Sequence, residues 1–130
     1  SLCLNANAFN TKDHRIAVLV NDQLITSYDI VQRMKLSAIL SGIEVTTANS
    51  NQLLNSVVDE LIKEKLKIQK INEYEIFVSE EEYIEQELLF FQNNPIEKEN
   101  IMKIFENNDI KYSEFKKYYY QQFSHCKVIF

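Results

Sequence analysis

The sequence predicts a mainly α-helical fold in which a short N-terminal β-hairpin is followed by about five helices. The 130 residues include one glycine and one proline, far below the average usage of about 7% and 5%. Because sandwiches and barrels need many Gly- and Pro-containing turns, this scarcity favours long helices. Two short apolar runs around Asn21-Asp22 supply the strand pattern, and they lie at the start of the chain.

Composition excludes several classes of protein. The length fits one domain, and 45% hydrophobic with 25% charged residues suits a chain that buries a core. A net charge of -5 without a basic stripe disfavours a phosphate-binding surface, so we expect no nucleic-acid partner. No apolar run reaches the roughly 18 residues of a membrane span, so we expect no membrane insertion. Two cysteines, Cys3 and Cys126, do not form a disulfide framework.

The first eight residues, SLCLNANA, are interpreted as the remnant of a clipped export signal. Ala6 and Ala8 fit the small-x-small pattern of a signal-peptidase site. The alternative is an ordinary frayed N-terminus. Lipid attachment at Cys3 fits poorly because the bulky Leu2 precedes it. The mature domain is then expected to span residues 9–130 and to work outside the cytoplasm.

The hairpin and the first helix follow from turn and cap signals. Strands are predicted at Ile16–Val20 and Leu24–Ile25, around a turn whose residue types tolerate positive φ. An isolated hairpin is marginal, so it must pack on a helix. The helix is expected from Ser27 to Leu40, with Thr26 and Asp29 as a capping box and Gly42 as a left-handed C-cap. Its inward residues are Ile30, Met34, Ile39 and Leu40.

The second helix is expected over residues 52–72, after a polar connection at residues 43–51. Its charged residues, Glu60 and Glu64 among them, are predicted to line a solvated face. The apolar stripe opposite them comprises Leu54, Val57, Val58, Leu61, Ile62 and Ile68.

The third helix is predicted to begin behind a capping box of Ser79 and Glu82 and to end near Gln92. Its glutamates are interpreted as complementing the helix dipole and then forming a solvated face, in preference to a cation site. One apolar face is assigned to Ile84, Leu88 and Phe91, whereas Leu89 and Phe90 lie elsewhere. This helix is therefore expected to contact two neighbours or a partner.

The last two helices are predicted over residues 95–106 and from Tyr112 onward. Pro95 suits the first position of the fourth helix, and Ile101, Ile104 and Phe105 point inward. The chain stops at Phe130 without a cap, which we interpret as an interruption inside a helix. The stripe of the fifth helix comprises Tyr112, Phe115, Tyr119, Phe123, Cys126 and Phe130.

No motif for catalysis is found. His14 and His125 lack the convergent partners of a metal site, and His125 and the adjacent Cys126 point in different directions on a helix. One glycine cannot build a phosphate loop, and no Gly-x-Ser-x-Gly elbow occurs. We expect no enzymatic activity, no cofactor and no metal.

Aromatic residues are the remaining signal, with seven Tyr and eight Phe. They are consistent with a core and its rim, or with a groove that accepts apolar peptide segments. The candidate peptide-binding residues are Met34, Ile39, Ile43, Tyr83, Phe90, Phe91, Phe105 and Tyr118, and any of them can equally belong to the core.

Four segments, in order, resemble the N-terminal domain of SurA-type periplasmic chaperones, which belong with the parvulin-type peptidyl-prolyl isomerases of Gram-negative bacteria. They are AVLVNDQLITSYDI, LLNSVVDELIKEKL, IFVSEEEY and DIKYSEFKKYYYQQF. The resemblance covers residues 16–130. No single segment is diagnostic, and the resemblance depends on the order and spacing of all four segments. Family members usually have Gly where Glu75 stands, so this loop is expected to differ.

The resemblance implies a peptide-binding fold like that of SurA and trigger factor, acting in the periplasm. It implies an ATP-independent chaperone for unfolded outer-membrane proteins and other aromatic-rich clients. The parvulin domain that normally follows is absent from these 130 residues, so the resemblance implies the chaperone module and not the isomerase. The alternative is a non-catalytic isomerase fragment that acts in assembly or self-association, for example as a homodimer that exchanges the last helix.

Overall fold

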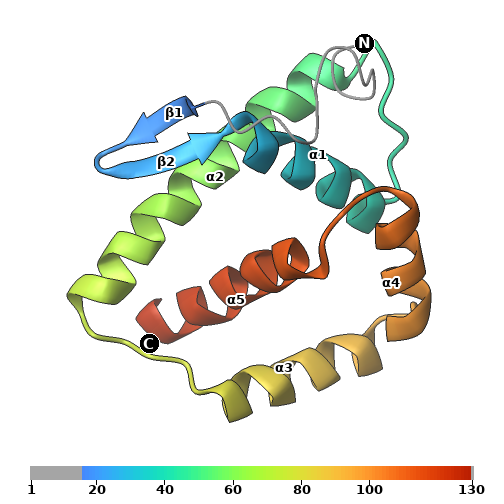
Figure 1. The fold of residues 1–130 in the computed structure, drawn as a ribbon. Coiled ribbons are helices and arrows are strands. Elements are labelled where there is room, and N and C mark those ends of the chain that lie inside the picture. The colour runs from blue at the N-terminus through green and yellow to red at the C-terminus, as the bar shows by residue number, and fades with distance from the viewer. Residues whose placement is uncertain (1–15, 130) are drawn as a thin grey trace. The chain divides into compact units, whose positions relative to one another are not determined.

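The computed structural model, drawn as a ribbon in Figure 1, describes residues 16–129. These residues divide into two compact units, residues 16–66 and residues 67–129. We call these unit 1 and unit 2 and treat each by itself. The predicted fold class is confirmed: a two-stranded antiparallel hairpin precedes five helices. The elements are β1 (Ile16–Val20), β2 (Gln23–Thr26), α1 (Ser27–Ser41), α2 (Ser50–Glu73), α3 (Glu80–Asn93), α4 (Lys98–Asn107) and α5 (Tyr112–Ile129). The export-signal interpretation concerns residues that lie outside the described range.

The hairpin forms where the sequence predicts it. Val20 pairs with Gln23 across the turn, and Asn21 takes a positive φ of 53°, which asparagine tolerates better than most residues. Side chains alternate between the two faces of a strand. Accordingly Ile25 is fully buried while its neighbour Leu24 is exposed. One face of the hairpin therefore joins the core of unit 1.

Helix α1 is held at both ends by the predicted caps. The Oγ1 atom of Thr26 accepts a hydrogen bond from the backbone N–H of Asp29 at 3.1 Å, and Asp29 Oδ2 accepts one from the N–H of Thr26 at 2.9 Å. Gly42 follows the last turn with φ 65°. These contacts satisfy backbone groups that a helix end leaves unpaired, so the bounds of α1 are set by local sequence.

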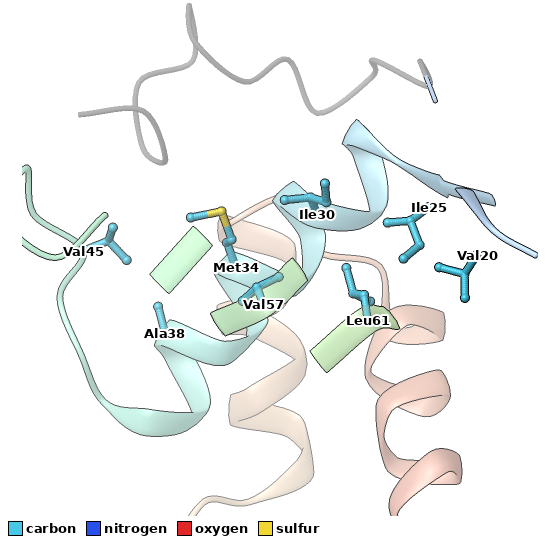
Figure 2. Close-up of a cluster of buried hydrophobic side chains, with 8 residues drawn as sticks. All are labelled: Val20, Ile25, Ile30, Met34, Ala38, Val45, Val57 and Leu61. Carbon is cyan, nitrogen blue, oxygen red and sulfur yellow. The ribbon is translucent and has the colours of Figure 1, made fainter. Parts of the chain in front are cut away.

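The core of unit 1 lies between the hairpin, α1 and the first turns of α2. Figure 2 shows its side chains gathered from these elements and from the connection after α1. The contributions of α1 follow the i, i+4 spacing of a helix that is apolar on one side. The buried set is Val20, Ile25, Ile30, Met34, Ala38, Val45, Val57 and Leu61.

A buried arginine ties α1 to α2 beside this core. The Arg33 guanidinium donates to Glu60 Oε1 at 2.9 Å and to both carboxylate oxygens of Glu64 at 2.7 and 3.1 Å. The Arg33 side chain is 5% exposed and that of Glu64 is 13% exposed. The prediction that Glu64 belongs to a solvated face was therefore wrong, because a buried cation 31 residues away in the sequence binds it. Glu60 also accepts from Arg33 but stays 35% exposed.

Three helices end in the same Schellman motif. In each, a residue with positive φ is followed by an isoleucine whose N–H donates five residues back: Ile43 to Ala38, Ile76 to Ile71 and Ile110 to Phe105. The residues with positive φ are Gly42, Glu75 and Asp109. Glu75 thus adopts the left-handed conformation that glycine favours.

We expect Glu75→Gly to raise the free energy of unfolding by roughly 0.5–1 kcal/mol, because it relieves left-handed strain at a small entropic cost. The matched change Gly42→Ala should lower it by about 1 kcal/mol. An added Cβ at Gly42 meets no atom within 4 Å, so only backbone strain acts there. Urea denaturation measures both variants, and opposite signs are the expected result; a destabilised Glu75→Gly would contradict it.

The connection between α3 and α4 departs from the prediction. Helix α4 begins at Lys98 behind Glu97, so Pro95 does not occupy its first position. Proline restricts the residue before it to extended backbone, and Asn94 has φ -114° and ψ 142°. The Asn94 side chain also donates to the Phe90 carbonyl at 2.7 Å. Pro95 therefore ends α3 instead of starting α4.

Candidate peptide-binding site

An aromatic cluster forms the interior of unit 2. Phe115 of α5 is its centre and has 0% exposure. Its ring centroid lies 5.5 Å from Phe90, 5.6 Å from Phe105 and 6.0 Å from Tyr119. Rings at these separations gain contact energy beyond the area they bury. The rings in contact within the cluster are Tyr83, Phe90, Phe91, Phe105, Tyr112, Phe115, Tyr119 and Tyr120.

Helix α3 packs on α5 with the side that carries Tyr83 and Phe90. Tyr83 and Phe90 contact the Tyr119 ring, and Glu87 lies between them at helical spacing. Ile84 and Leu88, which the sequence assigns to one apolar face together with Phe91, are 47% and 59% exposed, whereas Phe91 contacts the Phe115 ring. The side that packs on α5 contains the Glu87 carboxylate, which interrupts its apolar pattern in the sequence.

Glu87 is a buried carboxylate held by groups of unit 2. The Tyr112 hydroxyl donates to its Oε1 atom, and Lys98 Nζ lies 3.5 Å from the same oxygen. The Tyr119 hydroxyl donates to the carbonyl of Gln86 at 2.5 Å. A buried charge is tolerated when it is paired and hydrogen-bonded, so the assignment of every α3 glutamate to the dipole or a solvated face was wrong for Glu87.

Burial and the nearby carboxylate act together on three tyrosines. Burial, then the Glu87 charge and Tyr119, raise the pKa of Tyr83 to about 12. Burial and the hydrogen bond to Glu87 raise the pKa of Tyr112, and burial followed by the Glu87 charge raises that of Tyr119. The Tyr83 hydroxyl is buried without a hydrogen-bond partner among the described residues. These phenols therefore stay neutral over the physiological range.

We expect the stability of unit 2 to fall as the pH rises from about 10 towards 12. Because the pKa values of these phenols are raised in the folded chain, the unfolded chain releases their protons at lower pH. Proton release therefore stabilises the unfolded state relative to the folded state in that pH range. Tyrosinate absorbance should show a late-titrating fraction that disappears in urea. Tyr83→Phe should reduce this fraction without loss of stability at neutral pH, because it removes an unsatisfied hydroxyl. A single transition common to folded and unfolded chain would contradict the prediction.

The opposite side of α3 presents apolar side chains to solvent. Ile84, Leu88 and Leu89 are 47%, 59% and 41% exposed. We call Ile84 and Leu88, which stand one turn apart, the α3 strip. The sequence predicts that α3 contacts two neighbours or a partner, but its apolar pattern does not indicate which side is exposed. Tyr83, Glu87 and Phe90 follow helical spacing, and this is the sequence signal that could have identified the packed side of α3.

The eight candidate peptide-binding residues divide between the two units. Met34 and Phe105 are each 1% exposed and belong to the interiors of unit 1 and unit 2, so their side chains offer little surface to a peptide. Ile43 is exposed just after α1, and Ile39 is half-buried. The remaining four are half-buried residues of α3 and α5: Tyr83, Phe90, Phe91 and Tyr118.

Unit 2 also holds an open pocket of about 380 Å³ at the turn between α4 and α5. Its lining mixes apolar side chains with charges of both signs, including Lys103 and Glu106, so it selects no obvious ligand class. Among the side chains that the structure describes, those of residues 17–120, no group of histidine, cysteine or acidic residues could hold a metal ion. In the same part of the chain no helix has the length and apolar character needed to cross a membrane.

Comparison with known proteins yields no relative: no protein-family model, curated protein or solved structure matches the sequence.

Proposed function

We propose that this chain is an ATP-independent chaperone module that binds apolar and aromatic segments of unfolded polypeptides. The observation that carries the proposal is the two-sided character of α3. Its inner side packs on α5 through aromatic rings, while the α3 strip and Leu89 remain exposed. Adjacent exposed apolar side chains on a rigid support are typical of protein interaction sites.

The aromatic cluster contributes to this function mainly by holding α3 in place, and only its half-buried rings offer contact surface to a client. Phe115 and Phe105 are buried, so they fix α3 in position without touching a client. A client gains contact area only with the exposed side chains and the half-buried rims of Tyr83 and Phe91. Because such contacts are few and ordering an unfolded segment opposes binding, we expect weak and broadly specific affinity.

The resemblance to SurA-type chaperones adds the cellular setting to the proposal. The clients would be unfolded outer-membrane proteins, and the compartment would be the periplasm. The parvulin catalytic domain is not among these residues, so we expect the chain to leave the uncatalysed rate of proline isomerisation unchanged. A rate increase in an isomerisation assay would favour the alternative of an isomerase.

Titration of the full chain with a fluorescent, aromatic-rich unfolded peptide tests the proposal. We expect saturable binding at micromolar to sub-millimolar concentration and slower aggregation of an unfolded outer-membrane protein without ATP. The control for non-specific binding is the same chain in its unfolded state. It is unfolded in urea, diluted into the same buffer and kept unfolded by high temperature. No binding below millimolar concentration would overturn the proposal.

A further inference from the structure

The exposed side of α3 carries carboxylates next to its apolar residues. Residues three and four apart on a helix share a face. Glu81 and Glu85 therefore stand beside Ile84 and Leu88, and all four side chains are exposed. A client that covers the α3 strip must come within reach of both carboxylates.

Negative charge is concentrated on this one helix. The α3 sequence EEEYIEQELLFFQN contains five glutamates and no lysine or arginine, as many negative charges as the net charge of -5 of the whole chain. Glu87 is engaged by Tyr112 and Lys98 inside unit 2. Glu81 and Glu85 are exposed and make the outer side of α3 acidic, and Glu80 is exposed at the first position of the helix.

We infer that the α3 strip selects, among unfolded clients, amphipathic segments in which lysine or arginine flanks the apolar residues. This inference rests on the proposed function and names its client class. The apolar residues of such a segment cover Ile84 and Leu88 while its cations lie over Glu81 and Glu85. Charge complementarity of this kind raises the rate of association and discriminates between partners more than it adds affinity.

The same charges disfavour two other occupants. A second copy docked through its own α3 would bring two rows of glutamates together, and like charges across an interface are costly. Anionic lipid headgroups are repelled in the same way. The acidic rim therefore favours a basic polypeptide over self-pairing or a membrane surface.

Three peptides that share the same apolar and aromatic residues test the inference on the full chain. Their flanking positions carry lysine, glutamine or glutamate, and affinity is measured by fluorescence anisotropy. Exposed ion pairs each change affinity by about 1.5- to fivefold, so we expect the lysine peptide to bind roughly three- to tenfold more tightly than the glutamine peptide at low salt. The difference should shrink at high salt, and the glutamate peptide should bind most weakly.

Variants locate the effect. Glu81→Gln with Glu85→Gln should remove most of the preference for the lysine peptide. The matched control, Glu99→Gln with Glu106→Gln, changes the same charge at two exposed glutamates of α4 and should leave the preference intact. Ile84→Ser with Leu88→Ser should weaken the binding of all three peptides, and both positions are exposed enough for the fold to survive.

The outcomes separate this inference from the function it rests on. Equal affinity for the lysine and glutamine peptides overturns the inference while binding itself upholds the chaperone function. A preference that persists in Glu81→Gln with Glu85→Gln, or binding unaffected by Ile84→Ser with Leu88→Ser, also overturns it. Light scattering that shows dimers abolished by the serine variant would assign the strip to a second copy instead. Failure of all three peptides to bind is the failure of the proposed function.

Discussion

Replacing Arg33 with alanine should lower the free energy of unfolding by about 3 kcal/mol, the lower end of the range for breaking a buried ion pair. The guanidinium is 5% exposed and forms three hydrogen bonds to Glu60 and Glu64. Burial lowers the pKa of Arg33, but the hydrogen bonds and charges of Glu64 and Glu60 outweigh it and raise that pKa above its ordinary value. The cation is thus always present, and its removal leaves carboxylates without their partner.

Two further variants distinguish this cause from a simple loss of packing. Arg33→Met keeps most of the side-chain volume, and combining it with Glu64→Gln removes the more buried of the two unpaired charges, so the double variant should recover part of the loss. Lys63→Ala removes an exposed cation that pairs with Asp59 at 2.8 Å and should leave the stability nearly unchanged. Urea denaturation gives the free energies. An Arg33→Ala variant as stable as Lys63→Ala would show that the buried cluster contributes nothing.

Local signals were sufficient for the starts of α1 and α3. Thr26 with Asp29 and Ser79 with Glu82 lie three residues apart, and both contacts occur in the structure at 3.1 Å. Such contacts depend on the backbone of one turn and not on the rest of the fold. The hairpin turn at Asn21 is predictable for the same reason.

The positions of the helix ends were predicted to within one residue, but the left-handed C-cap was predicted only at the glycine. Gly42 signals a left-handed C-cap, but Glu75 and Asp109 adopt the same conformation without being glycine. The shared feature is the isoleucine that follows each of them, since the Schellman motif favours an apolar residue at that position. The pairs Gly42-Ile43, Glu75-Ile76 and Asp109-Ile110 carry a signal that residue-by-residue propensity misses.

The candidate site was harder to predict because it depends on charges that tertiary structure buries. Periodicity counts a carboxylate as the end of an apolar stripe. In α3 this rule leaves out Glu87, so the sequence does not show that Tyr83 and Phe90 belong to one packed side. The pairing of Glu87 with Tyr112, 25 residues away, is what makes its burial tolerable, and no local pattern encodes that partner.

Truncating Phe115 to alanine should cost about 3–5 kcal/mol, the usual range for removing a buried aromatic side chain. The ring is fully buried and contacts aromatic rings from α3, α4 and α5. Hydrogen exchange should accelerate first in peptides from these three helices. The control Met102→Ala changes a half-exposed side chain of α4 and should shift the stability by no more than about 0.5 kcal/mol. A loss below about 1 kcal/mol for Phe115→Ala would mean that the cluster is not the core of unit 2.

The same variant separates scaffold from contact surface in the proposed function. Phe115 has no exposed surface and cannot touch a client, yet it supports the rings of Phe90 and Phe91 beneath α3. Phe115→Ala should therefore weaken peptide binding even at temperatures where the chain stays folded, because α3 loses its fixed position and binding must also order it. Ile84→Ser with Leu88→Ser should weaken binding at unchanged stability. If Phe115→Ala binds peptides as well as the parent chain while folded, the rigid display of α3 is not what recognition requires.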